Sequence, residues 1–271
     1  MNDAAFRQPS LGQPLIGPDE PPPFEIVNPG GKAPLVLLCD HASRRIPTAF
    51  RNLGLDDAAF DLHIAYDIGA ADVTRLLATR LDAPAVLAGY SRLLIDLNRQ
   101  PGDPTSIPPV SDDVHVPGNR GLSREARQRR VEAFFWPYHK AAGDTIARQW
   151  TRGTPPAVFA VHSFTPRMGG RDRKWHVGVL SNRDRRMADP LLATLESRGD
   201  LVVGDNEPYS GKEVAYTLEV HAEAAGLPHC SVEIRQDLVA NAAGIRRWAD
   251  ILAAALDGIV GRAGLHRVER F

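Results

Sequence analysis

Short apolar runs end abruptly in polar residues at three places along the chain. The run 35–39 is followed by Asp40-His41, and the run 157–161 is followed by His162-Ser163. The third run, 230–234, carries Glu233 at its end. Because these runs are mostly apolar and do not alternate with polar residues, they predict strands buried on both faces, as in a parallel sheet. The carboxyl ends of such strands meet at one edge of an α/β sheet, where ligands bind. We therefore expect these polar side chains to share one cleft.

Between these runs, apolar positions recur every three to four residues, a spacing typical of helices. Helices are predicted at 56–81, 123–149, 187–198, between 211 and about 225, and at 242–260, with further strands at 84–88, 92–97, 175–180 and 200–203. Ser123 is the expected N-cap of the second helix, and Pro137 is expected to kink it. This alternation predicts an α/β protein with three αβα layers and a mixed, mostly parallel sheet.

Two segments lack this periodicity. Residues 1–30 are rich in proline and glycine and are predicted to form an extended N-terminal arm, with 31–271 as a single α/β domain. The stretch 100–121 reads as one long loop that contains several prolines, glycines and aspartates. Long loops in compact domains are usually functional, so we expect a functional role for this one.

Composition narrows the class of partner. The 271 residues carry a formal net charge of -1, which favours neither nucleic acid nor an acidic membrane surface. No apolar stretch approaches the roughly 20 residues of a membrane span, and no signal peptide is expected. The two cysteines, Cys39 and Cys230, fall inside predicted strands and give no disulfide framework. We expect a cytoplasmic protein with a small-molecule partner, either a monomer or a small homo-oligomer.

The polar residues at the strand ends suit a divalent metal, above all Zn²⁺. His41 and His162 are the expected imidazole ligands. Asp67 is the expected third ligand, because it follows His63 by four residues and shares a helix face with it. Asp67 is equally suited to orient a ligand histidine, to cap a helix or to pair with an arginine. Asp40 and His63 are further alternatives.

Other residues suit hydrolytic chemistry beside such a metal. A carboxylate at the end of a buried strand is costly unless it is paired or functional, so Glu233 is either a general base or the partner of Arg235. The segment 91–99 has Arg92 at its start and Asn98-Arg99 at its end. These groups suit carboxylate binding and oxyanion stabilisation, or else structural ion pairs such as Asp96 with Arg99. Arg171 and Tyr209, in separate loops, are additional candidates for binding substrate.

Taken together, these segments resemble the N-formylglutamate amidohydrolase family from about residue 34 to residue 257. The matching stretches are 40–41 with 45–47, 63–69, 91–99, 161–163 and 232–235. The resemblance implies hydrolysis of N-formyl-L-glutamate to formate and L-glutamate, the last step in one route of histidine degradation. It also implies a fold like that of the zinc-carboxypeptidase-like phosphorylases and hydrolases.

The segment 96–99 is also similar to zinc acyl-amino-acid deacylases related to carboxypeptidases. That similarity implies that Asn98 and Arg99 bind the α-carboxylate and that Arg92 polarises the scissile carbonyl. The chain departs from those deacylases at Arg44, where they place a ligand glutamate three residues after the first histidine. The alternatives are therefore a deacylase or peptidase for another N-acyl amino acid or a peptidoglycan fragment, and a carboxylate-binding protein without catalysis.

Overall fold

A seven-stranded sheet forms the centre of the computed structural model, which describes residues 6, 8–10, 12–262 and 264–271. The strands are β1 (Phe24–Val27), β2 (Leu35–Cys39), β3 (Ala85–Ala88), β6 (Ala157–Phe164), β9 (Val177–Leu180), β10 (Val203–Asp205) and β11 (His229–Arg235), in the spatial order β1-β3-β2-β6-β11-β9-β10. Strands β3, β2, β6 and β11 are mutually parallel. Strands β1 and β9 pair antiparallel with β3 and β11, so the predicted mixed, mostly parallel sheet is confirmed.

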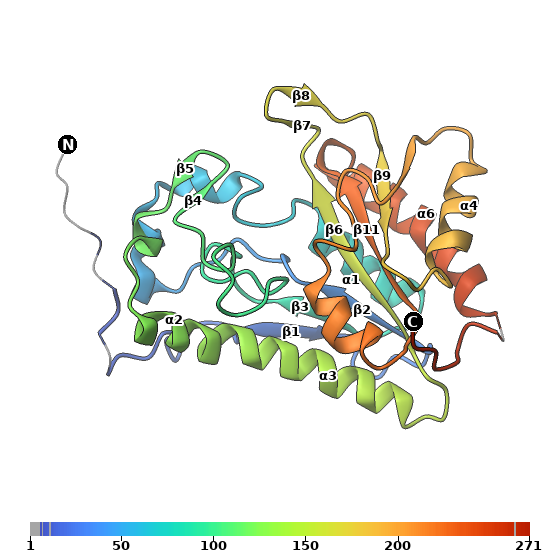
Figure 1. Cartoon of the computed structure of the whole chain (residues 1–271), viewed down its shortest axis with the longest axis horizontal. Coiled ribbons are helices and arrows are strands. Elements are labelled where there is room, and N and C mark those ends of the chain that lie inside the picture. The colour runs from blue at the N-terminus through green and yellow to red at the C-terminus, as the bar shows by residue number, and fades with distance from the viewer. Residues whose placement is uncertain (1–5, 7, 11, 263) are drawn as a thin grey trace.

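Helices cover both faces of the sheet (Figure 1). The helices are α1 (Ala70–Arg80), α2 (Arg124–Arg130), α3 (Trp136–Trp150), α4 (Ala188–Glu196), α5 (Tyr216–Leu218) and α6 (Ala242–Val260). Alternate residues of β2 point to opposite faces, and Leu35 and Leu37 pack with α1, α4 and α6. Val36 and Leu38 pack instead with α3, which gives the three predicted layers. No helix in the described part of the chain is long and apolar enough to cross a membrane.

The segment predicted as a strand at 92–97 is instead a series of tight turns. Its leucines and isoleucine are buried, as an apolar run requires. The backbone, however, bonds to side chains: Ser91 Oγ accepts from Leu93 N, and Asp96 Oδ1 accepts from Asn98 N. Short polar side chains that bond nearby backbone groups compete with a strand ladder. The prediction of a strand was wrong because burial alone does not distinguish these two structures.

Two predicted helices differ from the observed ones. The helix expected at 56–81 begins only at Ala70, after a single 3₁₀ turn at Asp57–Asp61. Gly69, with φ at 78°, ends the preceding turn and excludes a continuous helix. The helix expected at 123–149 does start at the Ser123 cap, but it widens into a π-helical turn at Val131–Phe135 before α3. The helix expected before residue 225 starts at Tyr216 and is short, with a π-helical turn at 219–223.

Two hairpins rise beyond the carboxyl ends of the parallel strands (Figure 1). The long loop 100–121 contains β4 (Val110–Ser111), β5 (Val114–His115) and a 3₁₀ turn at Pro117–Asn119. After β6, the chain forms the second hairpin from β7 (Arg167–Met168) and β8 (Arg171–Asp172). Within the segment predicted as an arm, 24–27 forms the edge strand β1.

Candidate active site

A cavity of about 260 Å³ lies at the carboxyl ends of β2, β6 and β11, between the two hairpins. Most of the predicted site residues line it, although they come from six separate segments. They are His41, Asp67, Arg92, Asn98, Arg99, His162, Tyr209 and Glu233. Arg171 does not line the cavity and is exposed on β8. The topology therefore brings together residues that are up to 192 positions apart, from His41 to Glu233.

Three of these side chains converge as metal ligands would. Asp67 Oδ2 lies 2.9 Å from His162 Nδ1 and 3.3 Å from His41 Nδ1. One ligand atom from each of the three buried residues lies within 4.8 Å of the others. A divalent ion bonded at about 2.0–2.2 Å to each atom needs such a cluster. Asp67 reaches it from the turn before α1, and not from the helix face that the sequence predicted.

The second nitrogen of each ring faces another carboxylate. His41 Nε2 lies 2.8 Å from Asp96 Oδ1, and His162 Nε2 lies 3.3 Å from Asp40 Oδ2. Without a metal, both Nδ1 atoms are hydrogen-bonded to Asp67. With a metal bound, a proton on each Nε2 would face these carboxylates and leave both Nδ1 lone pairs free for coordination. Histidines that bind metals usually donate their other N–H to a carboxylate in this way. The donor set and its surroundings thus fit Zn²⁺.

Backbone and side-chain contacts fix these residues in place. Asp67 N donates to the carbonyl oxygen of His41 at 2.9 Å, which ties the turn before α1 to the end of β2. Ser163 Oγ donates to the carbonyl oxygen of Ile68 at 2.8 Å, which ties the same turn to β6. Tyr138, on α3, donates its hydroxyl hydrogen to Asp40 Oδ1 at 2.7 Å. These three hydrogen bonds hold the segments that carry the candidate ligands, and none of them requires a bound metal.

The charges of the cluster shift its pKa values strongly. Burial lowers the pKa of His162, but hydrogen bonds to Asp40 and Asp67 outweigh this and raise that pKa well above its usual value. Burial likewise opposes the charged form of Asp67, yet His41 and His162 lower the pKa of this carboxyl. The pKa of Asp96 lies well below its ordinary value, because Arg92 and His41 outweigh the effect of burial. The cluster thus favours ionised aspartates beside protonated imidazoles, so binding of a metal to the histidines would release protons.

Glu233 lies opposite His162 in the parallel register of β11 and β6. Its side chain is buried, and its Oε2 has no hydrogen-bond partner among the described residues. Burial raises the pKa of Glu233 to about 7, although His162 opposes this rise. Arg235, the alternative partner, pairs instead with Asp237 at 2.7 Å. An unpartnered carboxyl with a pKa near neutrality is suited to accept and return a proton.

The two arginines of the segment 91–99 differ in their pairing. Arg92 Nη2 lies 2.5 Å from Asp96 Oδ2, and its Nη1 lies 3.6 Å from Asp67 Oδ1. Arg99 donates to the carbonyl oxygen of Asn98 at 2.8 Å and has no carboxylate within 4.0 Å in the described part of the chain. Asp96 therefore pairs with Arg92, and not with Arg99, which the sequence offered as an alternative partner. Arg99 is left with its charge available to the cavity.

Asn98 uses much of its side-chain amide within the protein. Its Nδ2 donates to the carbonyl oxygen of Val214 at 3.2 Å, and its Oδ1 accepts from Thr217 N at 3.0 Å. These bonds hold the start of α5 beside the cavity. One N–H of the amide remains for a ligand.

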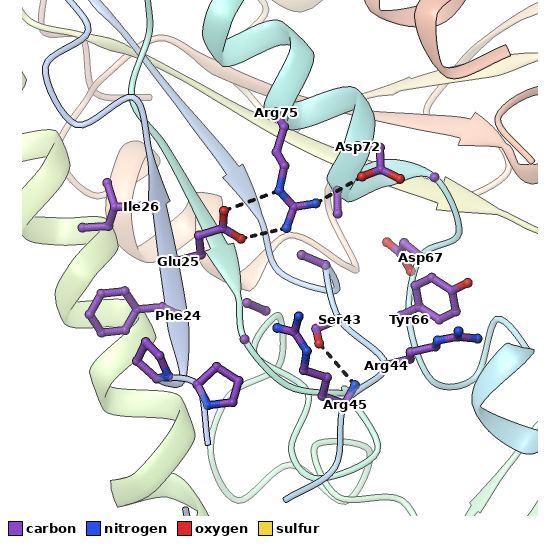
Figure 2. Close-up of a pocket in the computed structure, with 17 residues that line it drawn as sticks. Phe24, Glu25, Ile26, Ser43, Arg44, Arg45, Tyr66, Asp67, Asp72 and Arg75 are labelled. Atoms are coloured by element: carbon purple, nitrogen blue, oxygen red, sulfur yellow. Dashed lines mark hydrogen bonds and ion pairs between the residues drawn. The ribbon is translucent and has the colours of Figure 1, made fainter. Parts of the chain in front are cut away.

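The other sequence candidates lie away from the metal cluster. His63 is at the cavity rim, 3.3 Å from Asp112 Oδ2. Arg44 forms an ion pair with Asp61 and lies over the Tyr66 ring, 5.9 Å from its centroid. A second cavity has a volume of about 760 Å³ and shares Asp67 with the first. In Figure 2, Arg44 points away from the centre of this second cavity. No histidine lines this cavity, so we place the chemistry in the smaller one.

Two contributors to the site had no signal in the sequence. Tyr138 lies within a helix where its spacing indicates only core packing. Arg173 follows β8, and its Nη1 donates to the Tyr209 hydroxyl oxygen at 2.9 Å. Arg173 lies in the run 171–174, where the side chains of Arg171 and Lys174 are exposed. Only the folded hairpin distinguishes it from these neighbours.

Comparisons with known proteins show what the chain is similar to. A family model described as N-formylglutamate amidohydrolase matches residues 33–240. The crystal structure of a gene product from Agrobacterium tumefaciens is 34% identical, with a TM-score of 0.88, over 91% of this chain and 98% of that chain. The crystal structure of N-formylglutamate amidohydrolase from Ralstonia eutropha is 20% identical, with a TM-score of 0.66, over 88% of this chain and 97% of that chain. No curated protein matches the chain.

Proposed function

The chain belongs to the N-formylglutamate amidohydrolase family, a family of amide hydrolases, and we propose on that premise that it cleaves N-formyl-L-glutamate or a close analogue to formate and L-glutamate. The observation that carries the proposal is the convergence of His41, His162 and Asp67 beside the unpartnered carboxyl of Glu233. Three ligand atoms and a nearby proton acceptor are the parts that hydrolysis of an unreactive amide needs.

The metal, which we propose to be Zn²⁺, would be held by the Nδ1 atoms of His41 and His162 and by a carboxylate oxygen of Asp67. When bound, it supplies Lewis acidity and positive charge beside the scissile carbonyl. Asp96 and Asp40 would keep the two rings in the required tautomer through their contacts with Nε2.

Glu233 would move the proton in both halves of the reaction. Its Oε2 takes a proton from the attacking water as the new carbon–oxygen bond forms. The same oxygen then gives that proton to the amine nitrogen as the carbon–nitrogen bond breaks, so that Glu233 ends the cycle unchanged. Burial, which raises the pKa of Glu233 to about 7, makes both transfers feasible near neutral pH.

The remaining polar groups would bind and polarise the substrate. Arg92 lies beside Asp67 and would stabilise the negative charge that develops on the carbonyl oxygen. Arg99, whose charge has no carboxylate partner in the described chain, would bind the α-carboxylate together with the free N–H of Asn98. Tyr209 would donate its hydroxyl hydrogen to the substrate from the opposite wall. The product would enter amino-acid catabolism, as in histidine degradation, in the cytoplasm.

The test combines metal analysis with product measurement. Zinc is quantified in freshly purified protein, and formate and amine release are followed on formyl, acetyl and succinyl derivatives of glutamate and other amino acids. We expect one bound zinc per chain, the highest kcat/KM on N-formyl-L-glutamate, and loss of turnover on chelation. Glu233→Gln is expected to lower kcat by about 10³-fold, and the exposed-site control Glu132→Gln to leave it unchanged.

Turnover that persists after both chelation and Glu233→Gln contradicts the mechanism. A preference for another acyl group contradicts the proposed substrate but is consistent with the proposed amide hydrolysis. Binding of N-formyl-L-glutamate without any turnover by the zinc-loaded protein favours a carboxylate-binding protein without catalysis.

A further inference from the structure

Arg173 has an unusual environment at the edge of the cavity. It follows the β7–β8 hairpin, and its guanidinium is partly buried among neutral groups. Its Nη1 donates to the Tyr209 hydroxyl oxygen at 2.9 Å, and its Nη2 lies 2.8 Å from Met168 Sδ. The guanidinium carbon also lies 4.8 Å from the centroid of the Tyr209 ring and 5.7 Å from that of Phe164. Tyr209, Met168 and Phe164 all line the cavity, so Arg173 lies directly behind this part of its wall.

The positive charge of Arg173 has no carboxylate within 4.0 Å in the described part of the chain. The other arginines of this hairpin region are paired or solvent-exposed: Arg167 with Asp172 at 3.6 Å, and Arg235 with Asp237 at 2.7 Å. Neutral partners hold the Arg173 guanidinium in one position without neutralising its charge. A partly buried guanidinium with free N–H donors is a binding site for a planar anion.

The charge of Arg173 acts across the cavity. Burial lowers the pKa of His63, which lines the cavity; Asp112 opposes this shift, and the charges of Arg92 and Arg173 add to it. Arg92 is largely neutralised by Asp96, whereas Arg99 and Arg173 are not. Two uncompensated guanidinium groups from separate segments therefore lie at this cavity: Arg99 in its lining, and Arg173 directly behind Tyr209 and Met168.

We propose that Arg173, positioned by Tyr209, binds the second carboxylate of the substrate, while Arg99 binds the first. The cavity then selects N-acyl amino acids that carry two carboxylates over those that carry one. This inference rests on the proposed function for the identity of the reaction, but its charge argument applies to any small dicarboxylate. A side-chain amide in place of the second carboxylate leaves the guanidinium without a counter-charge, which a partly desolvated site penalises.

Paired substrates test the proposal. Wild-type protein and Arg173→Met are compared on N-formyl-L-glutamate and N-formyl-L-glutamine, which differ only in the second carboxylate. Wild type is expected to prefer the glutamate derivative by about 100-fold in kcat/KM. Arg173→Met is expected to lower kcat/KM for the glutamate derivative by about 30-fold to 100-fold, mainly through KM, and to change that for the glutamine derivative less than about twofold.

Arg167→Met, in the same hairpin, is the matched control and is expected to keep the wild-type preference. Unfolding midpoints verify that each variant is folded, and Arg173→Gln replaces Arg173→Met if the latter is not. A preference for glutamate that survives the loss of Arg173 overturns the proposal. So does a wild-type enzyme that hydrolyses both substrates equally well.

A binding measurement separates this proposal from the proposed function. Calorimetric titration of the zinc-loaded protein uses glutarate, with two carboxylates, and butyrate, with one. We expect Arg173→Met to weaken glutarate binding at least about tenfold and to leave butyrate binding unchanged. An inactive wild type with this pattern contradicts the proposed function but supports the inference, whereas equal glutarate affinity in both proteins overturns the inference.

Discussion

The two histidines of the site each lie between two carboxylates, and this determines the role of each ring nitrogen. Asp67 faces both Nδ1 atoms, and Asp96 and Asp40 face the Nε2 atoms of His41 and His162. Such an arrangement accumulates negative charge in a buried space, which Arg92 and protonated imidazoles offset when no metal is bound. Glu233, opposite His162 in the sheet, adds a further carboxyl to this environment. The residue-scale chemistry therefore depends on which of these groups is ionised.

Glu233 is expected to make stability depend on pH in the metal-free protein. Its pKa is raised to about 7 when folded, so the folded state binds a proton more tightly than the unfolded state does. Stability therefore falls as the pH rises from about 4.5 to about 7, and the cost remains above that range. Glu233→Gln removes this cost and is expected to stabilise the chelated protein at pH 8 by on the order of 3 kcal/mol, with little effect near pH 4.5.

Urea unfolding of the two proteins at both pH values measures this difference. The exposed-site variant Glu132→Gln provides the control, for which the same small effect is expected at both pH values. A stabilisation by Glu233→Gln that does not grow between pH 4.5 and pH 8 would contradict the assigned burial effect.

At the scale of elements, the turn between the first 3₁₀ segments and α1 determines the position of Asp67. Hydrogen bonds tie this turn to the end of β2 and to Ser163 on β6. Gly69 ends the turn with φ at 78°, and a Cβ at this position would lie 2.5 Å from the carbonyl oxygen of Val239. The turn therefore requires glycine both for its backbone conformation and for the close approach of the neighbouring loop.

Gly69→Ala is expected to destabilise the protein by about 2–4 kcal/mol, because the strain of a positive φ adds to the steric clash. It is also expected to weaken zinc binding by displacing Asp67. Denaturant unfolding and a zinc titration measure these two effects. Gly170→Ala is the matched control, since φ is 76° there but no atom lies within 4 Å of the added Cβ, and only about 1 kcal/mol is expected. Equal losses in the two variants would contradict the steric argument.

At the scale of the molecule, the site lies at the carboxyl end of the sheet, between the apolar clusters that cover its two faces. β2 and β6 contribute to the apolar clusters on both faces, and a candidate metal ligand lies within two residues of the carboxyl end of each. A metal that joins His41, Asp67 and His162 would therefore link three segments of the folded core. Because the unfolded chain does not hold these residues together, metal binding would stabilise the whole fold.

Zinc is expected to raise the stability of the chelated wild-type protein by about 4 kcal/mol at a free concentration 1,000 times the dissociation constant. His41→Ala is expected to abolish most of this gain, whereas His115→Ala, at an exposed position in the β4–β5 hairpin, is expected to retain it. Thermal unfolding with and without zinc measures the effect. An undiminished zinc-dependent gain in His41→Ala would place the metal elsewhere.

The sequence by itself determined the layers of the fold and the strand ends that carry the chemistry. Periodicity and strand burial are local properties, so the boundaries of β2, β6, β11 and α6 were close to those observed. The same local patterns placed His41, His162 and Glu233 at strand ends, which the parallel register then brings to one edge. The turn at 92–97 was missed because a buried apolar run fits either structure and only side-chain bonds distinguish them.

Only the tertiary structure decided how these residues face one another. The contacts of His41 with Asp67 and Asp96 span 26 and 55 positions, and that of His162 with Asp67 spans 95. Such contacts follow from how turns and hairpins pack, and no local pattern encodes them. For the same reason the sequence did not distinguish Arg173 from its exposed neighbours, and folding alone placed its guanidinium against Tyr209.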